Sequence, residues 1–152
     1  MELHVAHFLL CRKIWYNNTK PEEGFSLLGV LAHFDLPDGV EYPLRYERLF
    51  VYLQLWGETG EYRFRIRLVR IESLGYLGYD EAMEVPLGIG GENKDFHSPF
   101  GRPFELTGLN YVDEMALTLE SIRINDPGLY EFQLFAEGID EPLARERILA
   151  RE

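Results

Sequence analysis

Apolar and polar residues alternate along most of this chain, so that every second side chain is apolar over long stretches. A period of two is typical of a strand that buries one of its two faces. Gly, Pro, Asn and Asp cluster between these stretches, as turns require. The pattern therefore predicts an all-β chain, with strands expected within 2–15, 25–34, 48–72, 81–87, 102–109, 114–124 and 128–136.

The segment 48–72 predicts a β-hairpin around the loop 57–60. If Trp56 faces Glu61, the apolar residues of the two arms meet in the pairs Leu55–Tyr62, Leu53–Phe64, Val51–Ile66 and Leu49–Leu68. The opposite face then carries the pairs Gln54–Arg63, Tyr52–Arg65 and Phe50–Arg67. A shift by one residue would place arginines among leucines, so we expect this register to be well specified.

The stretch Asp126-x-Gly128-x-Tyr130-x-Phe132 has the spacing of a known corner. It is similar to the Asp-x-Gly-x-Tyr-x-Cys of immunoglobulin strand F, with phenylalanine in the place of the cysteine. In that fold the tyrosine hydroxyl bonds back to the backbone of the corner, and we expect the same of Tyr130. The chain is thus predicted to be one domain, residues 1–152, folded as a single antiparallel Greek-key β-sandwich. We expect it to be immunoglobulin-like, with about seven to nine strands.

Two parts of the chain allow more than one element. Residues 88–101 predict a long loop, which is uncommon in a compact domain and often functional. Residues 140–152 have helix-favouring types, with Glu141 and Arg145 at i,i+4 spacing. Their position directly after a strand and a turn favours a hairpin into a last edge strand. We expect the strand.

The order of these features resembles a family of small bacterial proteins of unknown function that are predicted or seen as β-sandwiches. The resemblance covers most of the chain and is weakest over residues 73–101. It implies the β-sandwich fold and brings no known activity, cofactor or active residue. The stretches that carry it are "HVAHFLLC", "FSLLGVLAHF", "FVYLQLWGETGEYRFRIRL" and "DPGLYEFQLF".

The charge and the cysteine content indicate which classes of partner and which cellular compartment to expect. The formal net charge is −11, and it is concentrated in residues 77–152, which contain six Lys/Arg and sixteen Asp/Glu. Such a field repels phosphate backbones, so we expect no nucleic-acid partner. No apolar run approaches the ~20 residues that cross a bilayer, so we expect no membrane partner. The first residues have no basic segment ahead of an apolar one, so we do not expect them to be a signal peptide. The single cysteine favours a reducing cytoplasm.

No combination of residues predicts a catalytic, metal or cofactor site. Cys11 and His7 share a face of a regular strand but lie about 13 Å apart, too far for the imidazole to activate the thiol. A buried, apolar cysteine is the expected alternative. The four histidines lack zinc-ligand spacing, and the acids fit no EF-hand pattern. The glycines at 88, 90 and 91 lack the following helix and Lys-Ser/Thr step of a phosphate loop.

The outward face of the predicted hairpin is the candidate binding surface. Tyr, Trp and Arg are enriched at interface hot spots, and guanidinium groups stack on aromatic rings. The residues of this surface are Phe50, Tyr52, Trp56, Arg63, Arg65 and Arg67. The alternative is a solvated face whose arginines cover the aromatics, with Glu131 or Glu137 as counterions.

Two functions follow. The first is a non-enzymatic interaction module that binds a protein partner or a second copy of itself through this surface. A homodimer would pair the arginines with the acidic second half of another copy. The second is a ligand-binding or hydrolytic protein that acts through residues 88–101, with Glu92, Asp95 and His97 as its polar groups.

Overall fold

The strands account for every regular element in the part of the chain that the computed structural model describes. That part comprises residues 3–16, 20, 24–31, 33–34, 41–71, 79–85, 87–88, 104–106, 108 and 112–150. Within these ranges no residue is helical, so the predicted all-β class is confirmed. The loop predicted at 88–101 and its polar residues Glu92, Asp95 and His97 lie outside the described residues, except for Gly88.

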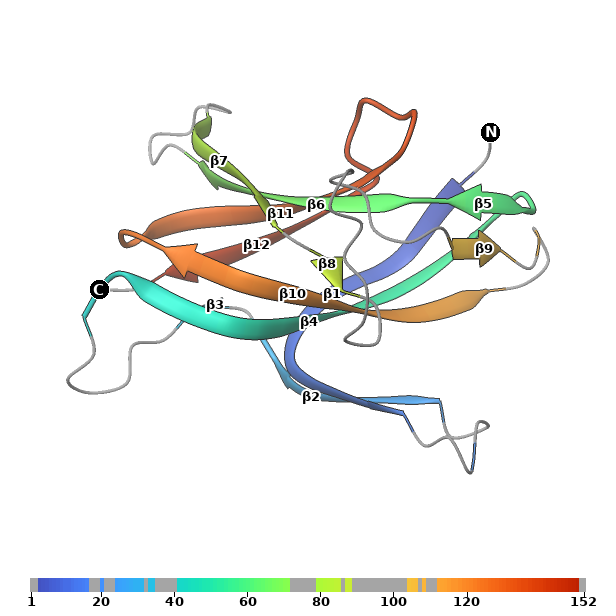
Figure 1. Ribbon diagram of the computed structural model, residues 1–152, viewed down its shortest axis with the longest axis horizontal. Coiled ribbons are helices and arrows are strands. Elements are labelled where there is room, and N and C mark those ends of the chain that lie inside the picture. The colour runs from blue at the N-terminus through green and yellow to red at the C-terminus, as the bar shows by residue number, and fades with distance from the viewer. Residues whose placement is uncertain are drawn as a thin grey trace.

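The strands form three sheets (Figure 1). Sheet A has the order β2 (Phe25–Val30), β1 (Leu3–Tyr16), β4 (Leu44–Gly57), β10 (Asp113–Ile124) and β8 (Leu87–Gly88). Sheet B has the order β3 (His33–Phe34), β12 (Ala144–Ala150), β11 (Gly128–Ala136), β6 (Phe64–Ile71) and β7 (Tyr79–Val85). Sheet C pairs β5 (Gly60–Tyr62) with β9 (Phe104–Leu106). Neighbouring strands are antiparallel, except that β3 runs parallel to β12.

Sheets A and B lie in two layers (Figure 1), and buried apolar residues of both sheets form one hydrophobic core. Leu53 of β4 is fully buried there, and so, within a few per cent, are Phe64 of β6 and Tyr130 of β11. Alternate residues of each strand point to opposite faces. The residues between these core positions therefore lie on the two outer faces of the molecule.

The hairpin predicted over 48–72 is wrong. β4 pairs with β1 and β10 in sheet A, whereas β6 pairs with β11 and β7 in sheet B. The chain passes between the sheets through β5, whose partner is β9. The apolar faces were assigned correctly, because Leu53 and Phe64 are both core residues. They belong to opposite layers of the core and not to neighbouring strands. Two strands that pack across the core show the same alternation of apolar and polar residues as two strands that pair in a hairpin.

The strand predicted over 25–34 is divided. β2 ends at Val30, at the edge of sheet A, and β3 begins at His33 beside β12 of sheet B. Gly29 has a φ of 65°, a left-handed conformation that interrupts an extended run and that glycine adopts at little cost. Beyond the end of β2, the backbone N–H of Leu31 still donates to the carbonyl of Leu10 on β1 at 2.8 Å.

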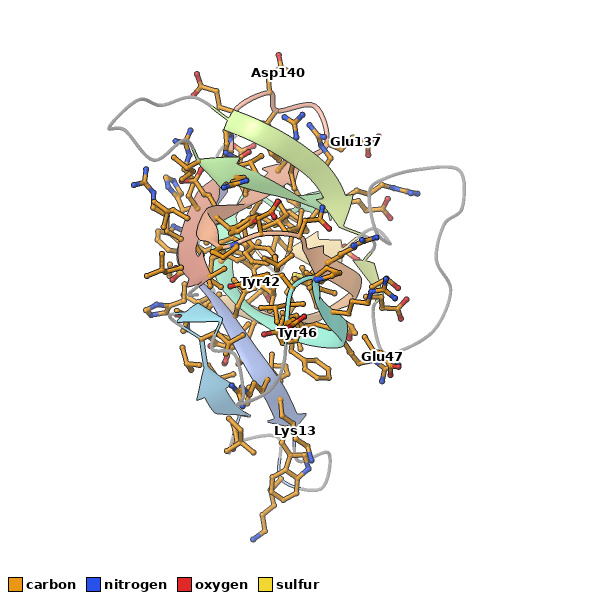
Figure 2. The ribbon with its side chains drawn as sticks, turned by 90° about the vertical axis from the view of Figure 1, so that its left-hand side faces the viewer. Lys13, Tyr42, Tyr46, Glu47, Glu137 and Asp140 are labelled. Atoms are coloured by element: carbon orange, nitrogen blue, oxygen red, sulfur yellow. The ribbon has the colours of Figure 1, made fainter. Side chains whose placement is uncertain are left out.

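The β1–β2 arm, residues 11–16 and 25–30, projects from sheet A. β4 accompanies β1 only as far as Cys11, after which β1 pairs with β2 in the described part of the chain. The arm carries the exposed apolar side chains of Trp15, Leu28 and Val30. Figure 2 shows Lys13 at its far end, away from the body of the protein.

The predicted corner bond is confirmed. The hydroxyl of Tyr130 donates to the carbonyl oxygen of Asp126 at 2.7 Å. The same four-residue return occurs a second time, where the Tyr62 hydroxyl donates to the carbonyl of Glu58 at 2.8 Å. The expected last strand is confirmed as well, since β12 pairs with β11 in a hairpin. Both tyrosines belong to the shared core, so each bond anchors a turn to it.

Tyr130→Phe is expected to lower the free energy of unfolding by about 1 kcal/mol, because the partly buried Asp126 carbonyl loses its donor. Urea unfolding followed by circular dichroism measures this. Tyr52→Phe is the matched control, since the hydroxyl of Tyr52 bonds to Glu114 at an exposed position where water replaces it. Equal losses in the two variants would contradict a special contribution of the corner.

Candidate functional site

The structure separates the six residues of the predicted binding surface. Phe50, Tyr52 and Trp56 lie on the outer face of sheet A, between the core positions of β4. Arg65 and Arg67 lie on the outer face of sheet B, between the core positions of β6. Because the two faces look away from each other across the core, the six residues do not form one surface.

The aromatic residues on sheet A are engaged with neighbours on their own face. Trp56 stacks on the ring of His4, with 5.0 Å between ring centroids. Tyr52 meets the ring of Phe25 edge-on at 6.0 Å, and its hydroxyl donates to a carboxylate oxygen of Glu114. Burial and this carboxylate raise the pKa of Tyr52 to about 12. These contacts tie β4 to β1, β2 and β10, which favours a structural role for the aromatic half of the set.

The arginines of β6 lie beside β11. The guanidinium carbon of Arg65 sits 4.4 Å from the ring centre of Phe135. Arg67 is directly opposite Gln133 across the β6–β11 ladder. Arg63 precedes β6, and its Nε lies 3.9 Å from a carboxylate oxygen of Glu137. The predicted counterion role is thus confirmed for Glu137.

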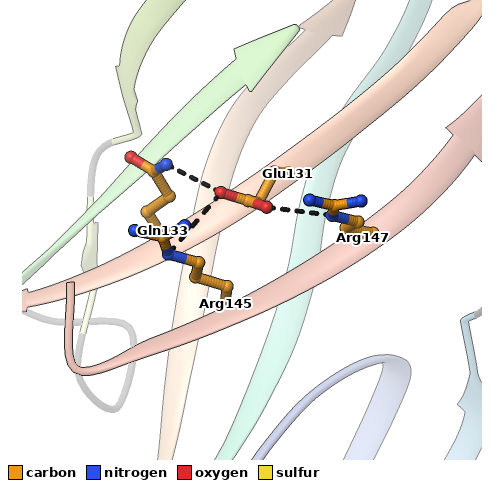
Figure 3. Close-up of polar contacts among 4 residues, drawn as sticks. All are labelled: Glu131, Gln133, Arg145 and Arg147. Atoms are coloured by element: carbon orange, nitrogen blue, oxygen red, sulfur yellow. Dashed lines mark hydrogen bonds and ion pairs between the residues drawn. The ribbon is translucent and has the colours of Figure 1, made fainter. Parts of the chain in front are cut away.

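A buried carboxylate occupies the centre of this outer face (Figure 3). Glu131 projects from β11, on the side away from the core, yet it is only 1% exposed. Its Oε2 accepts a hydrogen bond from Nε of Arg147 at 3.1 Å, and its Oε1 lies 3.9 Å from Nε of Arg145. Nε2 of Gln133 donates to the same Oε1 at 2.8 Å. Both carboxylate oxygens are therefore occupied by groups on the sheet.

Strand register explains why these side chains converge. β11 runs between β12 and β6, so each of its outward residues has a neighbour on both sides. Gln133 lies opposite Arg145 on β12 and opposite Arg67 on β6. Glu131 lies opposite Arg147. We call this set the arginine face; its residues are Arg65, Arg67, Glu131, Gln133, Phe135, Arg145 and Arg147.

The arginine face can recognise carboxylate groups. A guanidinium group has five N–H donors in a planar fork that matches a carboxylate. The contacts that Arg145 and Arg147 make with Glu131 use Nε alone. In the described part of the chain their side chains form no other ion pair, and they remain 48% and 52% exposed. Two positive charges thus share one carboxylate, and most of their donors lie toward solvent.

Arg145, Arg147 and Gln133 were not among the predicted site residues. Their signal in the sequence is an alternation, "ARER" in the last strand and "EFQ" in β11. The two arginines, Glu131 and Gln133 face outward, whereas Glu146 lies opposite Phe132 on the other face. This alternation reveals a site only when β12 is placed beside β11. The region 140–152 was compatible with a helix, which would have put Arg145 and Arg147 on different sides.

The other candidate chemistry is not supported by the described residues. Cys11 is fully buried, as expected, and burial raises the pKa of its thiol to about 11. A thiol protonated at neutral pH is a poor nucleophile. Among the described side chains, no group of three His, Cys, Asp or Glu is arranged to hold a metal ion. No helix in the described part of the chain could cross a membrane.

Comparison with known proteins assigns no family. No family model and no curated protein matches the chain. A solved structure of the alkylpurine DNA glycosylase AlkC from Pseudomonas fluorescens, bound to DNA containing an abasic site analog, is similar with a TM-score of 0.40 and 13% identity. The match covers 70% of this chain and 26% of that one, so this chain spans about a quarter of the glycosylase chain.

Proposed function

We propose that this protein is a non-enzymatic interaction module that binds an acidic protein segment through its arginine face. The carrying observation is the sharing of buried Glu131 by Arg145 and Arg147. The carboxylate of Glu131 lies between the two guanidinium groups, and each approaches it with its Nε atom (Figure 3). Their remaining donors are presented to solvent with the side chains already ordered, which reduces the entropy lost on binding.

Charge supports an acidic partner. The chain as a whole carries a formal net charge of −11, whereas on the arginine face two half-exposed arginines, Arg145 and Arg147, share the single carboxylate of Glu131. A partner rich in aspartate and glutamate would be repelled by most of the surface and attracted here. Such complementarity directs the partner to one face and fixes its orientation.

The finer description of the fold belongs to the same proposal. We propose an immunoglobulin-like β-sandwich of the kind found in small bacterial proteins, acting in the cytoplasm. The shared core of sheets A and B and the Tyr130 corner bond support it. A module of this kind offers its outer sheet faces for binding, which is where the arginine face lies.

Binding of a fluorescein-labelled ten-residue polyglutamate peptide tests the proposed function. Fluorescence anisotropy in 20 mM salt is expected to show micromolar affinity for the unmodified protein. The variant Glu131→Gln/Arg145→Gln/Arg147→Gln is expected to bind at least fivefold more weakly. This variant leaves no buried charge without a partner, so we expect it to stay folded.

The matched control is Arg12→Gln/Lys13→Gln, which removes two positive charges from the exposed β1–β2 arm. We expect this variant to bind like the unmodified protein. If the control loses as much affinity as the triple variant, attraction is a property of total charge and the proposed face is wrong. Sedimentation equilibrium of the unmodified protein and of the triple variant tests whether the acidic partner is a second copy of the chain. A dimer for the unmodified protein and a monomer for the triple variant would identify the second copy as the partner.

A further inference from the structure

Sheet A is creased where β4 and β10 pass each other. Successive core residues are spaced by three positions, Leu119 and Ile122 on β10, and not by the usual two. The β4–β10 ladder pairs Glu120 with Arg48 and resumes with the pair Ile122–Tyr46. Ser121 lies between these two pairs. Ser121 has a φ of 57°. A non-glycine residue seldom adopts this conformation, and such outliers cluster at functional sites.

A cavity of about 300 Å³ lies at this crease. Figure 2 shows two of its residues, Tyr46 and Glu47, at the start of β4. This volume is at the lower end of the range for small-molecule sites. Among the residues that the structure describes, the cavity is lined by Arg45, Tyr46, Glu47, Ser121, Ile122 and Arg123.

Two arginines lie side by side in the lining of this cavity. Arg45 and Arg123 are directly opposite in the β4–β10 ladder. Their Cβ atoms are therefore about 5 Å apart, and like charges in this position destabilise a sheet. Both side chains are exposed, and neither has an ion pair or hydrogen bond among the residues that the structure describes. An anion placed between them would convert this repulsion into attraction.

We propose that this cavity binds a small phosphomonoester. Two guanidinium groups match the charge of a dianionic phosphate and its planar pairs of oxygens. The hydroxyl of Ser121 provides a further donor at the same edge. Glu47 is the one acid among the described lining residues, and in this proposal it accepts a hydrogen bond from a hydroxyl group on the organic part of the ligand. The size of the cavity favours a free sugar phosphate, and the negative net charge of the chain disfavours nucleic acid.

Thermal unfolding with added ligand tests this site, at constant ionic strength set with sodium chloride. With 20 mM inorganic phosphate we expect the Tm to rise by about 4 °C, for a dissociation constant of about 1 mM. Glucose 6-phosphate is expected to give a larger rise, and glucose or succinate none. Arg45→Gln and Arg123→Gln should each abolish the rise while leaving the ligand-free Tm equal or higher. Arg12→Gln, on the β1–β2 arm, is the control and should keep the full rise.

Glu47→Gln tests recognition of the sugar separately from recognition of the phosphate. The rise with inorganic phosphate should persist, and the additional rise with glucose 6-phosphate should disappear. No rise with either phosphate in the unmodified protein would overturn the proposal. A rise that survives in both Arg45→Gln and Arg123→Gln would overturn it too, because the anion would then bind elsewhere, for example on the arginine face.

Discussion

Phe132→Ala is expected to lower the free energy of unfolding by about 3–5 kcal/mol, the range for removing a large aromatic side chain from a packed core. Phe132 is fully buried in the centre of β11, between Tyr130 and Leu134. β11 is the middle strand of sheet B, so the surrounding residues cannot collapse into the cavity without disturbing two ladders. Urea unfolding followed by circular dichroism measures the loss.

Leu149→Ala is the matched control for this substitution. Leu149 lies on the neighbouring strand β12 but is 42% exposed, so we expect its loss to stay below about 0.5 kcal/mol. A loss at Phe132 as small as at Leu149 would mean that sheet B does not pack on sheet A through β11. The shared core described above would then be incorrect.

Arg145→Gln/Arg147→Gln is expected to destabilise the protein by about 3 kcal/mol, because Glu131 then keeps a buried charge without a cation beside it. Removing the partners of a buried ion is costly, whereas removing surface ion pairs usually is not. The side chain of Glu131 is 1% exposed and those of the two arginines are about half exposed. The cost therefore comes from Glu131 and not from the arginines themselves.

A mutant cycle with Glu131→Gln isolates this effect. In the triple variant the buried position is neutral, so we expect most of the lost stability to return. Chemical unfolding of the four proteins in the cycle yields the coupling free energy. Additive losses, with no recovery in the triple variant, would show that Glu131 is not held by these arginines and would remove the basis of the arginine face.

The sequence predicted which face each strand buries better than which strands are neighbours. Leu53, Phe64 and Tyr130 were expected in the core and are there. The hairpin that joined β4 to β6 failed because a period of two fixes only the orientation of side chains. A strand whose apolar face meets another strand across the core has the same pattern as one that meets it along a ladder. The actual partners, β10 and β11, are distant in the chain.

The candidate site depends on which strands are neighbours, so most of it could not be predicted from the sequence. Arg65 and Arg67 were identified as surface arginines, but the aromatic ring beneath Arg65 is that of Phe135 and not of a residue of β4. Burial of Glu131 depends on Arg147 lying opposite it, which follows only from the β11–β12 register. The Tyr130 corner was predictable, since all of its atoms lie within five residues.

Both large sheets combine strands from the two halves of the chain. In sheet A, β4 of the first half pairs with β10 of the second half, and in sheet B, β6 of the first half lies between β11 and β7 of the second half. A cut between Ile71 and Tyr79 would leave β4 and β6 intact in one fragment, but β4 would lose β10 and β6 would lose both β11 and β7. Neither fragment would have a complete sheet, whereas the mixed fragments would have every strand required. The chain is thereby suited to fragment complementation, in which a signal appears only when two separately expressed pieces meet.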